Sequence, residues 1–257
     1  MNDNTLSLFR ECADNVIEDV KSLDFGSYGQ VKGMGADGTP IKGIDEEAER
    51  IALDFFMDNC DHNILSEEAG SIKRGGEHTI IMDPVDGTSN AINGIPFYCI
   101  SLALAKEDML SVSVGLVKSL TDYNEYYAVK GKGAYKNDVR LAPTLGEKWN
   151  FSVYMGKKAH EDCRRVAFMS DRTRSMGSAA LEISMVAEGI LDLYYMKTPD
   201  KQRSLRITDI AASSLILKEA GGRILGSDFE ELNMDLDPKQ REDVIALYDD
   251  RILEAIR

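Results

Sequence analysis

Two aspartates, Asp83 and Asp86, stand directly after a short apolar run and could bind a metal. The run, residues 79–82, reads T-I-I-M and is typical of a buried strand. Pro84 between the aspartates fixes one backbone φ angle and removes an N–H donor. Gly87 lets the chain turn and approach a ligand closely. Carboxylate oxygens in this position favour hard cations such as Mg²⁺.

The residues after the aspartates predict the start of a helix. Thr88, Ser89 and Asn90 are favourable residues at a helix N-terminus, where free N–H groups bind anions. We therefore expect the N–H groups of Gly87, Thr88 and Ser89 to hold a phosphate. Carboxylates for cations beside an anion site predict phosphate chemistry run by Mg²⁺.

Residues 83–90, D-P-V-D-G-T-S-N, resemble the signature D-P-[IVL]-D-G-T-[ST]-N of the inositol monophosphatase family. The resemblance implies that the carboxylates of Asp83 and Asp86 and the backbone carbonyl of Val85 bind metal. The alternative is an ordinary turn with incidental acids. A D-x-x-D pattern alone favours that alternative, whereas the full octapeptide after an apolar strand favours the metal site.

A third acid precedes this segment. Residues 66–68, S-E-E, follow a strand predicted at 63–65 and resemble the G-E-E of the family, whose first glutamate ligates metal. The resemblance implies that Glu67 is a ligand, and Ser66 departs from the common glycine. Without this context, the two glutamates would be a solvated surface pair.

A fourth acid comes from the second half of the chain. Residues 208–212, T-D-I-A-A, with E-A-G-G at 219–222, resemble the second family signature, W-D-x-A-[AG] with E-A-G-G downstream. The resemblance implies that Asp209 ligates metal. Thr208 replaces the aromatic residue, a change that concerns packing on the substrate side. The alternative is a plain N-cap role for Asp209.

Bringing these acids together requires cations. At an effective dielectric constant near 20, two like charges about 4 Å apart repel by roughly 4 kcal/mol. The cluster forms only with cations bound or with raised pKa values. Two or three Mg²⁺ would satisfy it, because oxygen-only ligands suit Mg²⁺ better than zinc. The four acids are Glu67, Asp83, Asp86 and Asp209.

The segment 35–45 looks like the archaeal-type members of the family that also hydrolyse fructose 1,6-bisphosphate, with Lys42 and Asp45 at the matching positions. The resemblance implies direct attack by a metal-activated water. Glu67 and Thr88 would position and deprotonate that water, with Asp45 as the partner of Thr88. A solvated lysine and a helix cap at Asp45 are the alternatives.

Basic residues precede two segments. Arg172 and Arg174 come before residues 177–179, and Lys201, Arg203 and Arg206 come before Asp209. Arginine suits bidentate phosphate binding. Residues 174–180 look like the family segment that lines the substrate sugar, which implies substrate contacts from Arg174 and Ala179. Residues 201–203, K-Q-R, stand where inositol-specific members carry an acid, which favours a second phosphate bound by Arg203. Asp86, Gly87, Thr88 and Ser89 complete the substrate set. Surface charge for solubility is the alternative for the arginines.

Apolar spacing predicts helices at 4–23, capped by Asn4 or Thr5, and at 45–58, capped by Asp45. The six glycines between Gly26 and Gly43 predict a mobile or turning segment. Its position before a helix suggests a lid, and a plain linker is the alternative. Strands at 98–106, 110–118 and 125–130 predict an antiparallel meander. The second half alternates, with strands at 151–155, 166–169, 190–196, 223–225 and 244–248 and helices at 159–165, 178–188, 208–220 and 250–256.

A composition shift at 143–148 divides the chain into an N-terminal α+β lobe, residues 1–143, and a C-terminal α/β lobe, residues 144–257, which form one functional unit. The fold class is α+β, with α/β layering. The resemblance implies the carbohydrate (sugar) phosphatase fold, an αβαβα sandwich.

Composition excludes several classes of protein. The 257 residues carry a net charge of −14, which disfavours non-specific binding to nucleic acid or to anionic membranes. There is no apolar run of about 18 residues, as a membrane span requires, and no signal-peptide pattern. We therefore expect a soluble, cytoplasmic protein. Four scattered cysteines predict free thiols. Three separated histidines give little support for zinc hydrolysis or a Ser-His-Asp triad.

The predicted function is Mg²⁺-dependent hydrolysis of a phosphomonoester on a small sugar or polyol, fructose 1,6-bisphosphate and/or inositol 1-phosphate, without a covalent intermediate. The resemblance implies a homodimer. The alternatives are a 3′-phosphoadenosine-type nucleotide phosphatase, for which no aromatic adenine clamp is evident, and a non-catalytic metal- or phosphate-binding protein.

Overall fold

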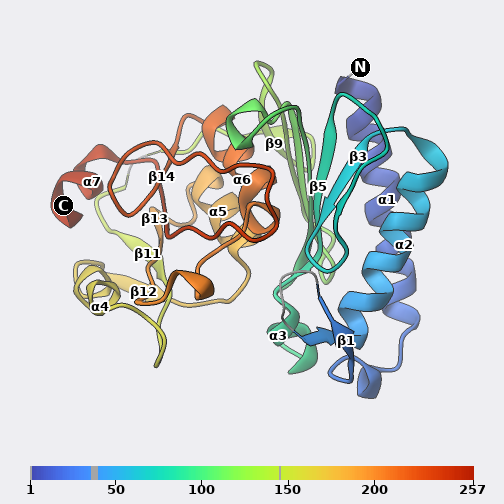
Figure 1. Ribbon diagram of the computed structural model, residues 1–257. Helices are drawn as coiled ribbons and strands as arrows, with labels where there is room; N and C mark the ends of the chain where they lie inside the picture. Colours follow the sequence, from blue (N-terminus) through green and yellow to red (C-terminus); the bar gives the residue numbers. More distant parts are fainter. Residues whose placement is uncertain (1, 36–39, 145) are drawn as a thin grey trace.

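The structure, a computed structural model, describes residues 2–35, 40–144 and 146–257 and has five layers (Figure 1). Helices α1 and α2 cover the outer face of an eight-stranded sheet. Helices α5 and α6 lie between that sheet and a five-stranded sheet, whose other face is covered by α4 and α7. This arrangement confirms the predicted αβαβα sandwich.

The first half of the chain supplies the outer helices and the larger sheet. Its elements are α1 (Asn2–Ser22), η1 (Phe25–Ser27), β1 (Val31–Met34), β2 (Pro40–Lys42), α2 (Gly43–Asn59), β3 (Asn63–Ser66), β4 (Gly70–Ile72), β5 (Thr79–Asp86), α3 (Thr88–Ile92), β6 (Cys99–Ala105), η2 (Met109–Ser111), β7 (Val114–Ser119), β8 (Glu125–Val129), β9 (Gly133–Lys136) and β10 (Val139–Arg140).

The second half supplies the smaller sheet and the middle and far helices. Its elements are β11 (Asn150–Val153), α4 (Glu161–Ala167), β12 (Arg172–Arg174), α5 (Ala179–Glu188), β13 (Leu193–Met196), η3 (Lys201–Arg203), α6 (Ile207–Glu219), β14 (Arg223–Leu225), β15 (Val244–Leu247) and α7 (Asp250–Ile256). Because each sheet draws its strands from one half, we keep the lobe boundary after residue 143 as a proposal.

Strand β5 lies inside the larger sheet, whose order is β10-β9-β8-β7-β6-β5-β3-β4. All eight residues of β5 are buried, which explains its continuous apolar start, because helices cover both faces of the sheet. Strands β5 to β10 pair antiparallel in succession. The predicted meander is therefore confirmed and is longer than expected.

Helix α6 joins the two halves. Eleven of its residues are buried, and it packs on β6 and β7 of the larger sheet and on β14 of the smaller one. Gly115 of β7 permits the close approach, since a Cβ there would lie 2.7 Å from the carbonyl oxygen of Ala212. The small residues Ala211 and Ala212 thus allow tight packing, as the sequence predicted.

Several predicted boundaries are wrong. Helix α1 begins at Asn2, so neither Asn4 nor Thr5 caps it. Helix α2 begins at Gly43 after Lys42, so Asp45 lies inside the first turn and is not the cap. The strand predicted at 110–118 begins at Val114, because η2 occupies 109–111 with a capping box from Asp108. Local residue preference sets such ends only to within a few positions.

The strand predicted at 166–169 is also wrong. Val166 lies in α4, where Val166 and Cys163, three residues apart, are both buried, and a short apolar run does not distinguish a buried helix face from a strand. The strand in this region is β12. The predicted glycine-rich turning segment contains the antiparallel pair β1 and β2, but its residues 36–39, like residue 145 of the predicted boundary, lie outside the described residues.

Two predictions from composition can be compared with the structure. All four cysteines, Cys12, Cys60, Cys99 and Cys163, are free thiols, and Cys60 is the one that is not fully buried. Among the described helices, none has both the length and the apolar character to cross a membrane.

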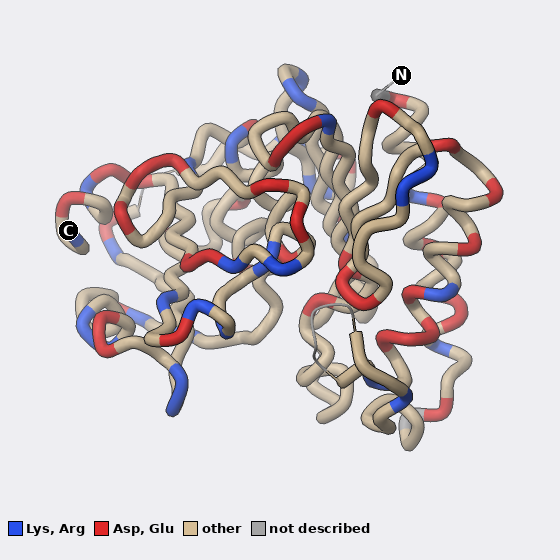
Figure 2. Tube along the Cα trace, in the orientation of Figure 1, with Lys and Arg blue, Asp and Glu red and all other residues tan. Residues whose placement is uncertain are grey.

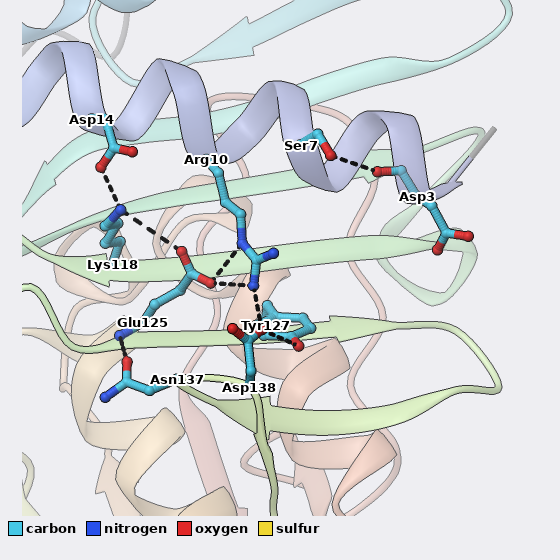
Figure 3. A network of polar contacts seen from close by, with 9 residues as sticks. All are labelled: Asp3, Ser7, Arg10, Asp14, Lys118, Glu125, Tyr127, Asn137 and Asp138. Carbon is cyan, nitrogen blue, oxygen red and sulfur yellow. Dashed lines mark hydrogen bonds and ion pairs between the residues drawn. The ribbon is translucent and has the colours of Figure 1, made fainter.

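A polar network attaches α1 to the larger sheet (Figure 3). The Arg10 guanidinium donates to Glu125 Oε1 from Nε at 2.8 Å and lies 2.8 Å from Asp138 Oδ1. The guanidinium also covers the Tyr127 ring at 4.6 Å, and Lys118 lies 3.8 Å from Glu125. Because Glu125 is only 8% exposed, its charge depends on these partners.

We predict that Arg10→Met lowers the free energy of unfolding by about 1–3 kcal/mol, because Glu125 loses a charged hydrogen-bond donor in a buried position. Urea denaturation measures the change. The matched control is Arg50→Met on α2, whose pairs with Glu47 and Asp54 are exposed and contribute about 0.5 kcal/mol or less. Equal losses in the two variants would contradict a special role for the buried pair.

Candidate active site

The site begins where β5 ends. Asp83 and Asp86 are 3% and 9% exposed, and the pairing of β5 with β6 is irregular between them. Asp83 Oδ1 accepts the Val85 N–H at 3.0 Å, and the Val85 carbonyl oxygen lies 3.1 Å from Thr88 Oγ1. The interruption of the ladder at Pro84 therefore turns backbone groups of this segment toward the site.

Three carboxylates from three separate elements converge at this end of β5. Glu67 comes from the β3–β4 loop, Asp83 from β5 and Asp209 from α6, and one oxygen of each lies within 4.8 Å of the others. An oxygen-only donor set of this charge fits a hard divalent cation. Of the four predicted carboxylate ligands, Asp86 is the one that stands outside this group.

Asp86 is held from the other half of the chain. Its Oδ2 accepts from Ser178 Oγ and from the Ala180 N–H, both at 2.7 Å. Among the described residues, no hydrogen bond engages Oδ1. The predicted metal ligand is therefore oriented on one oxygen and open on the other.

Burial and mutual repulsion keep protons on the two aspartates of β5. Burial raises the pKa of Asp83 well above its ordinary value, and the charges of Asp86 and Asp209 add to this effect. Burial, with the charge of Asp209, raises the pKa of Asp86 to about 7. Without a cation, the folded protein therefore holds these carboxyl groups partly protonated.

The predicted pair Thr88 and Asp45 is brought together. Thr88 Oγ1 lies 2.8 Å from Asp45 Oδ1, so the hydroxyl can donate to the carboxylate. Burial raises the pKa of Asp45 to about 6. A threonine hydroxyl bound to a carboxylate beside the acidic cluster can orient a water molecule and pass on its proton.

Gly87 shapes the start of α3 next to the cluster. Its φ is +101°, in the left-handed region, and a Cβ there would lie 3.0 Å from the Tyr98 Cβ. Helix α3 then begins at Thr88. The first bonds of the helix run from the Asn90 and Ala91 N–H groups to the Gly87 carbonyl, so the N–H groups of Thr88 and Ser89 precede them, at the position where the sequence predicts phosphate binding.

Asp209 and Arg206 differ from expectation in their local roles. Helix α6 begins at Ile207, so Asp209 is its third residue and not its N-cap, and Asp209 Oδ2 accepts the Arg206 N–H at 2.8 Å. The Arg206 guanidinium forms an ion pair with Glu67. Arg206 of the second half, which was predicted to bind phosphate, thus contacts Glu67 of the first half, a predicted metal ligand.

The remaining basic residues do not line the cavity beside the site. That cavity, about 190 Å³, is bordered by Asp86, Tyr154, Ser175, Gly177, Ala179, Glu182, Tyr194, Met196 and Leu205. Arg174 is exposed on β12, and Arg203 lies 3.6 Å from Asp200 in an exposed pair. Figure 2 shows Lys and Arg gathered at the lower left, where Figure 1 places α4 and β12.

Glu49, a buried residue of α2, supports the site and was not predicted from the sequence. Its Oε1 accepts from Ser66 Oγ and from the N–H groups of Glu68 and Ala69, the latter two at 3.1 Å. Glu49 thereby fixes the loop that carries Glu67. The serine at position 66, where the family signature has glycine, was the available signal.

Comparison with known proteins agrees with this geometry. A model described as the inositol monophosphatase family matches residues 6–256. The chain belongs to the inositol monophosphatase family. Family members are metal-dependent, and the three converging carboxylates of this chain match that property.

Three similar proteins show the range of activities for which relatives of this chain are named. A fructose-1,6-bisphosphatase/inositol-1-monophosphatase from Archaeoglobus fulgidus is 33% identical, over 99% of this chain and 98% of its own length. A bifunctional NADP phosphatase/NAD kinase from Methanococcus maripaludis is 34% identical over 91% of this chain, which spans only 46% of that protein. A solved Pyrococcus horikoshii structure, described as similar to inositol-1 monophosphatase, has TM-score 0.86 and 28% identity, over 100% and 98% of the two chains.

We predict that the metal-free protein loses stability as pH rises from about 4 to about 7. The folded pKa of Asp86, about 7, exceeds its ordinary 3.8, so the folded state binds more protons in this window. The resulting stabilisation is complete at low pH and is lost as the proton leaves. Urea denaturation in EDTA, compared between wild type and Asp86→Asn, measures the difference.

The wild type should lose free energy of unfolding more steeply than Asp86→Asn across this pH range. Added divalent cation should stabilise the wild type at pH 8 and should stabilise the variant less, since Glu67, Asp83 and Asp209 remain in the variant. Parallel pH profiles in EDTA would contradict the raised pKa of the buried Asp86 carboxyl group.

Proposed function

We propose that this protein is a Mg²⁺-dependent phosphoric monoester hydrolase that acts on fructose 1,6-bisphosphate and/or inositol 1-phosphate. The observation that carries the proposal is the convergence of Glu67, Asp83 and Asp209 next to the Thr88–Asp45 pair. The family, and relatives named for both substrates, support the choice of reaction.

Metal binding is assigned to the carboxylates around the end of β5. Two or three Mg²⁺ would be held by Glu67, Asp83, Asp86 and Asp209 and by the Val85 carbonyl. When bound, Mg²⁺ lowers the pKa of a water molecule and offsets charge on the leaving oxygen. The open Oδ1 of Asp86 and the buried, repelling aspartates support this ligand set.

The remaining steps belong to side chains and backbone N–H groups. Thr88 orients the attacking water and passes its proton toward Asp45, and Glu67 shares the positioning of that water. The N–H groups of Gly87, Thr88 and Ser89 hold the phosphate. Asp86 and Ala179 face the substrate at the cavity edge. Arg174 and Arg203, which are exposed outside the cavity, would bind a second phosphate that extends beyond it.

A nucleotide substrate is the second candidate. The Methanococcus maripaludis relative is named for NADP phosphatase activity, and NADP carries a phosphomonoester on a ribose. The 3′-phosphoadenosine-type alternative from the sequence is of the same kind, because it too would place a phosphomonoester on a ribose at this site. A non-catalytic binding role is disfavoured by the intact Thr88–Asp45 pair.

Location and assembly are proposed from the composition and from the resemblance to the family. We propose a cytoplasmic enzyme that binds neither nucleic acid nor membranes, in keeping with its net charge of −14. We also propose a homodimer, from the resemblance to the family. Sedimentation at micromolar concentration tests the assembly.

We predict phosphate release from fructose 1,6-bisphosphate and from inositol 1-phosphate in Mg²⁺ and none in EDTA. Asp83→Asn should lower kcat/KM by roughly 10³-fold, the size of loss expected when a main electrostatic stabiliser of a transition state is removed. Circular dichroism checks that the variant folds. The matched control is Asp54→Asn, whose side chain is 68% exposed and contacts Arg50 and should leave turnover unchanged.

The substrate comparison decides between the candidates. Turnover of both substrates would support dual specificity, and Arg174→Gln and Arg203→Gln should then raise KM for the bisphosphate alone. Turnover of inositol phosphate alone would leave these arginines as surface charge. Turnover of NADP alone would move the assignment to nucleotides, and retained turnover in Asp83→Asn would contradict the metal assignment.

A further inference from the structure

Glu182 is a buried acid that the proposed reaction does not use. It lies in the first turn of α5, is 3% exposed and borders the cavity beside Asp86. A buried carboxylate without compensating partners would be costly. Its contacts therefore indicate what it does.

The carboxylate accepts from three consecutive backbone N–H groups. Oε1 accepts from Met176 at 3.1 Å, and Oε2 accepts from Gly177 at 3.0 Å and from Ser178 at 3.1 Å. Ser152 of β11 donates its hydroxyl to Oε1. Every partner is a donor, so the ionised side chain fits this position and a neutral amide does not.

The segment held by Glu182 is the one that holds Asp86. Ser178 gives its N–H to Glu182 and its hydroxyl to Asp86 Oδ2, and Ala180 adds its N–H to the same oxygen. On the opposite side, Asn90 Nδ2 donates to the Met176 carbonyl at 2.7 Å. Residues 176–178 are thus held by the Glu182 carboxylate and the Asn90 amide. Ser178, the last of them, binds Asp86.

We propose that Glu182 is a positioning residue for the metal site: it fixes residues 176–178 so that Ser178 and Ala180 hold Asp86 Oδ2 and leave Oδ1 for a cation. This inference rests on the proposed function for the role of Asp86 and adds a residue to it. Glu182 acts through the segment and not on the substrate. Loss of its charge should loosen Asp86 and weaken cation binding without removing a ligand.

The test is a titration of the whole chain with Mn²⁺ in the absence of substrate, in which electron paramagnetic resonance measures binding. Glu182→Gln keeps the size of the side chain but points an amide N–H₂ at backbone N–H groups. The dissociation constant for Mn²⁺ should rise by roughly 10- to 100-fold, as for other partners that orient a metal ligand. Thermal unfolding confirms that the variant is folded at the temperature of the titration.

The matched control is Glu188→Gln, the same change on the same helix. Glu188 pairs with Lys136 at 2.8 Å and accepts from the Tyr126 hydroxyl at 2.5 Å, so its loss costs stability without touching the segment. Its Mn²⁺ affinity should match that of the wild type. Ser178→Ala should weaken binding too, and the double variant Glu182→Gln with Ser178→Ala should lose less than the product of the single losses.

If Glu182→Gln does not fold, Ser152→Ala carries the test, because it removes one donor from Glu182 and should raise the dissociation constant roughly 2- to 10-fold. Wild-type affinity in either folded variant would overturn the inference while leaving the proposed function intact. Absence of Mn²⁺ binding by the wild-type protein would overturn both.

Discussion

The main physical constraint on the structure is the electrostatic repulsion among the carboxylates at the end of β5, which the rest of the fold must offset. Asp83 and Asp86 are buried, and their raised pKa values show that burial and neighbouring charge oppose ionisation there. The fold opposes this repulsion with the Arg206 ion pair on Glu67 and with donors on Asp86. These contacts offset part of the charge and leave room for cations to offset the rest.

The scaffold brings the acids together because the end of β5 and the beginning of α6 lie at the same place. Strand β5 supplies two aspartates from the larger sheet, while α6 supplies Asp209 from the second half. Helix α6 is fixed between the sheets by close packing of Ala212 on Gly115. Because a buried helix with a tight contact cannot slide freely, the distance between Asp209 and Asp83 is set by the core and not by a loop.

The sequence predicted correctly what a clear pattern or a family signature specifies, and it failed where an apolar run was ambiguous or where a contact forms only on folding. The buried run of β5, the turn at Gly87 and the pairing of Thr88 with Asp45 followed from a short segment and its resemblance to a known family. The strand predicted at 166–169 failed because a helix can bury the same apolar pattern. Arg206 was assigned to phosphate because its partner, Glu67, is close only after folding.

The buried acids divide by what their oxygens accept. The chain has 44 Asp and Glu residues, and composition cannot separate those that bind ligands from those that stabilise loops. The Glu182 carboxylate accepts from three backbone N–H groups and a hydroxyl, with donors on both of its oxygens. Asp86 is satisfied on one oxygen only, and Asp83 accepts one backbone N–H. Unfilled acceptor positions on a buried carboxylate are costly without a cation, which supports the proposed roles of Asp83 and Asp86 as ligands and of Glu182 as a positioning residue.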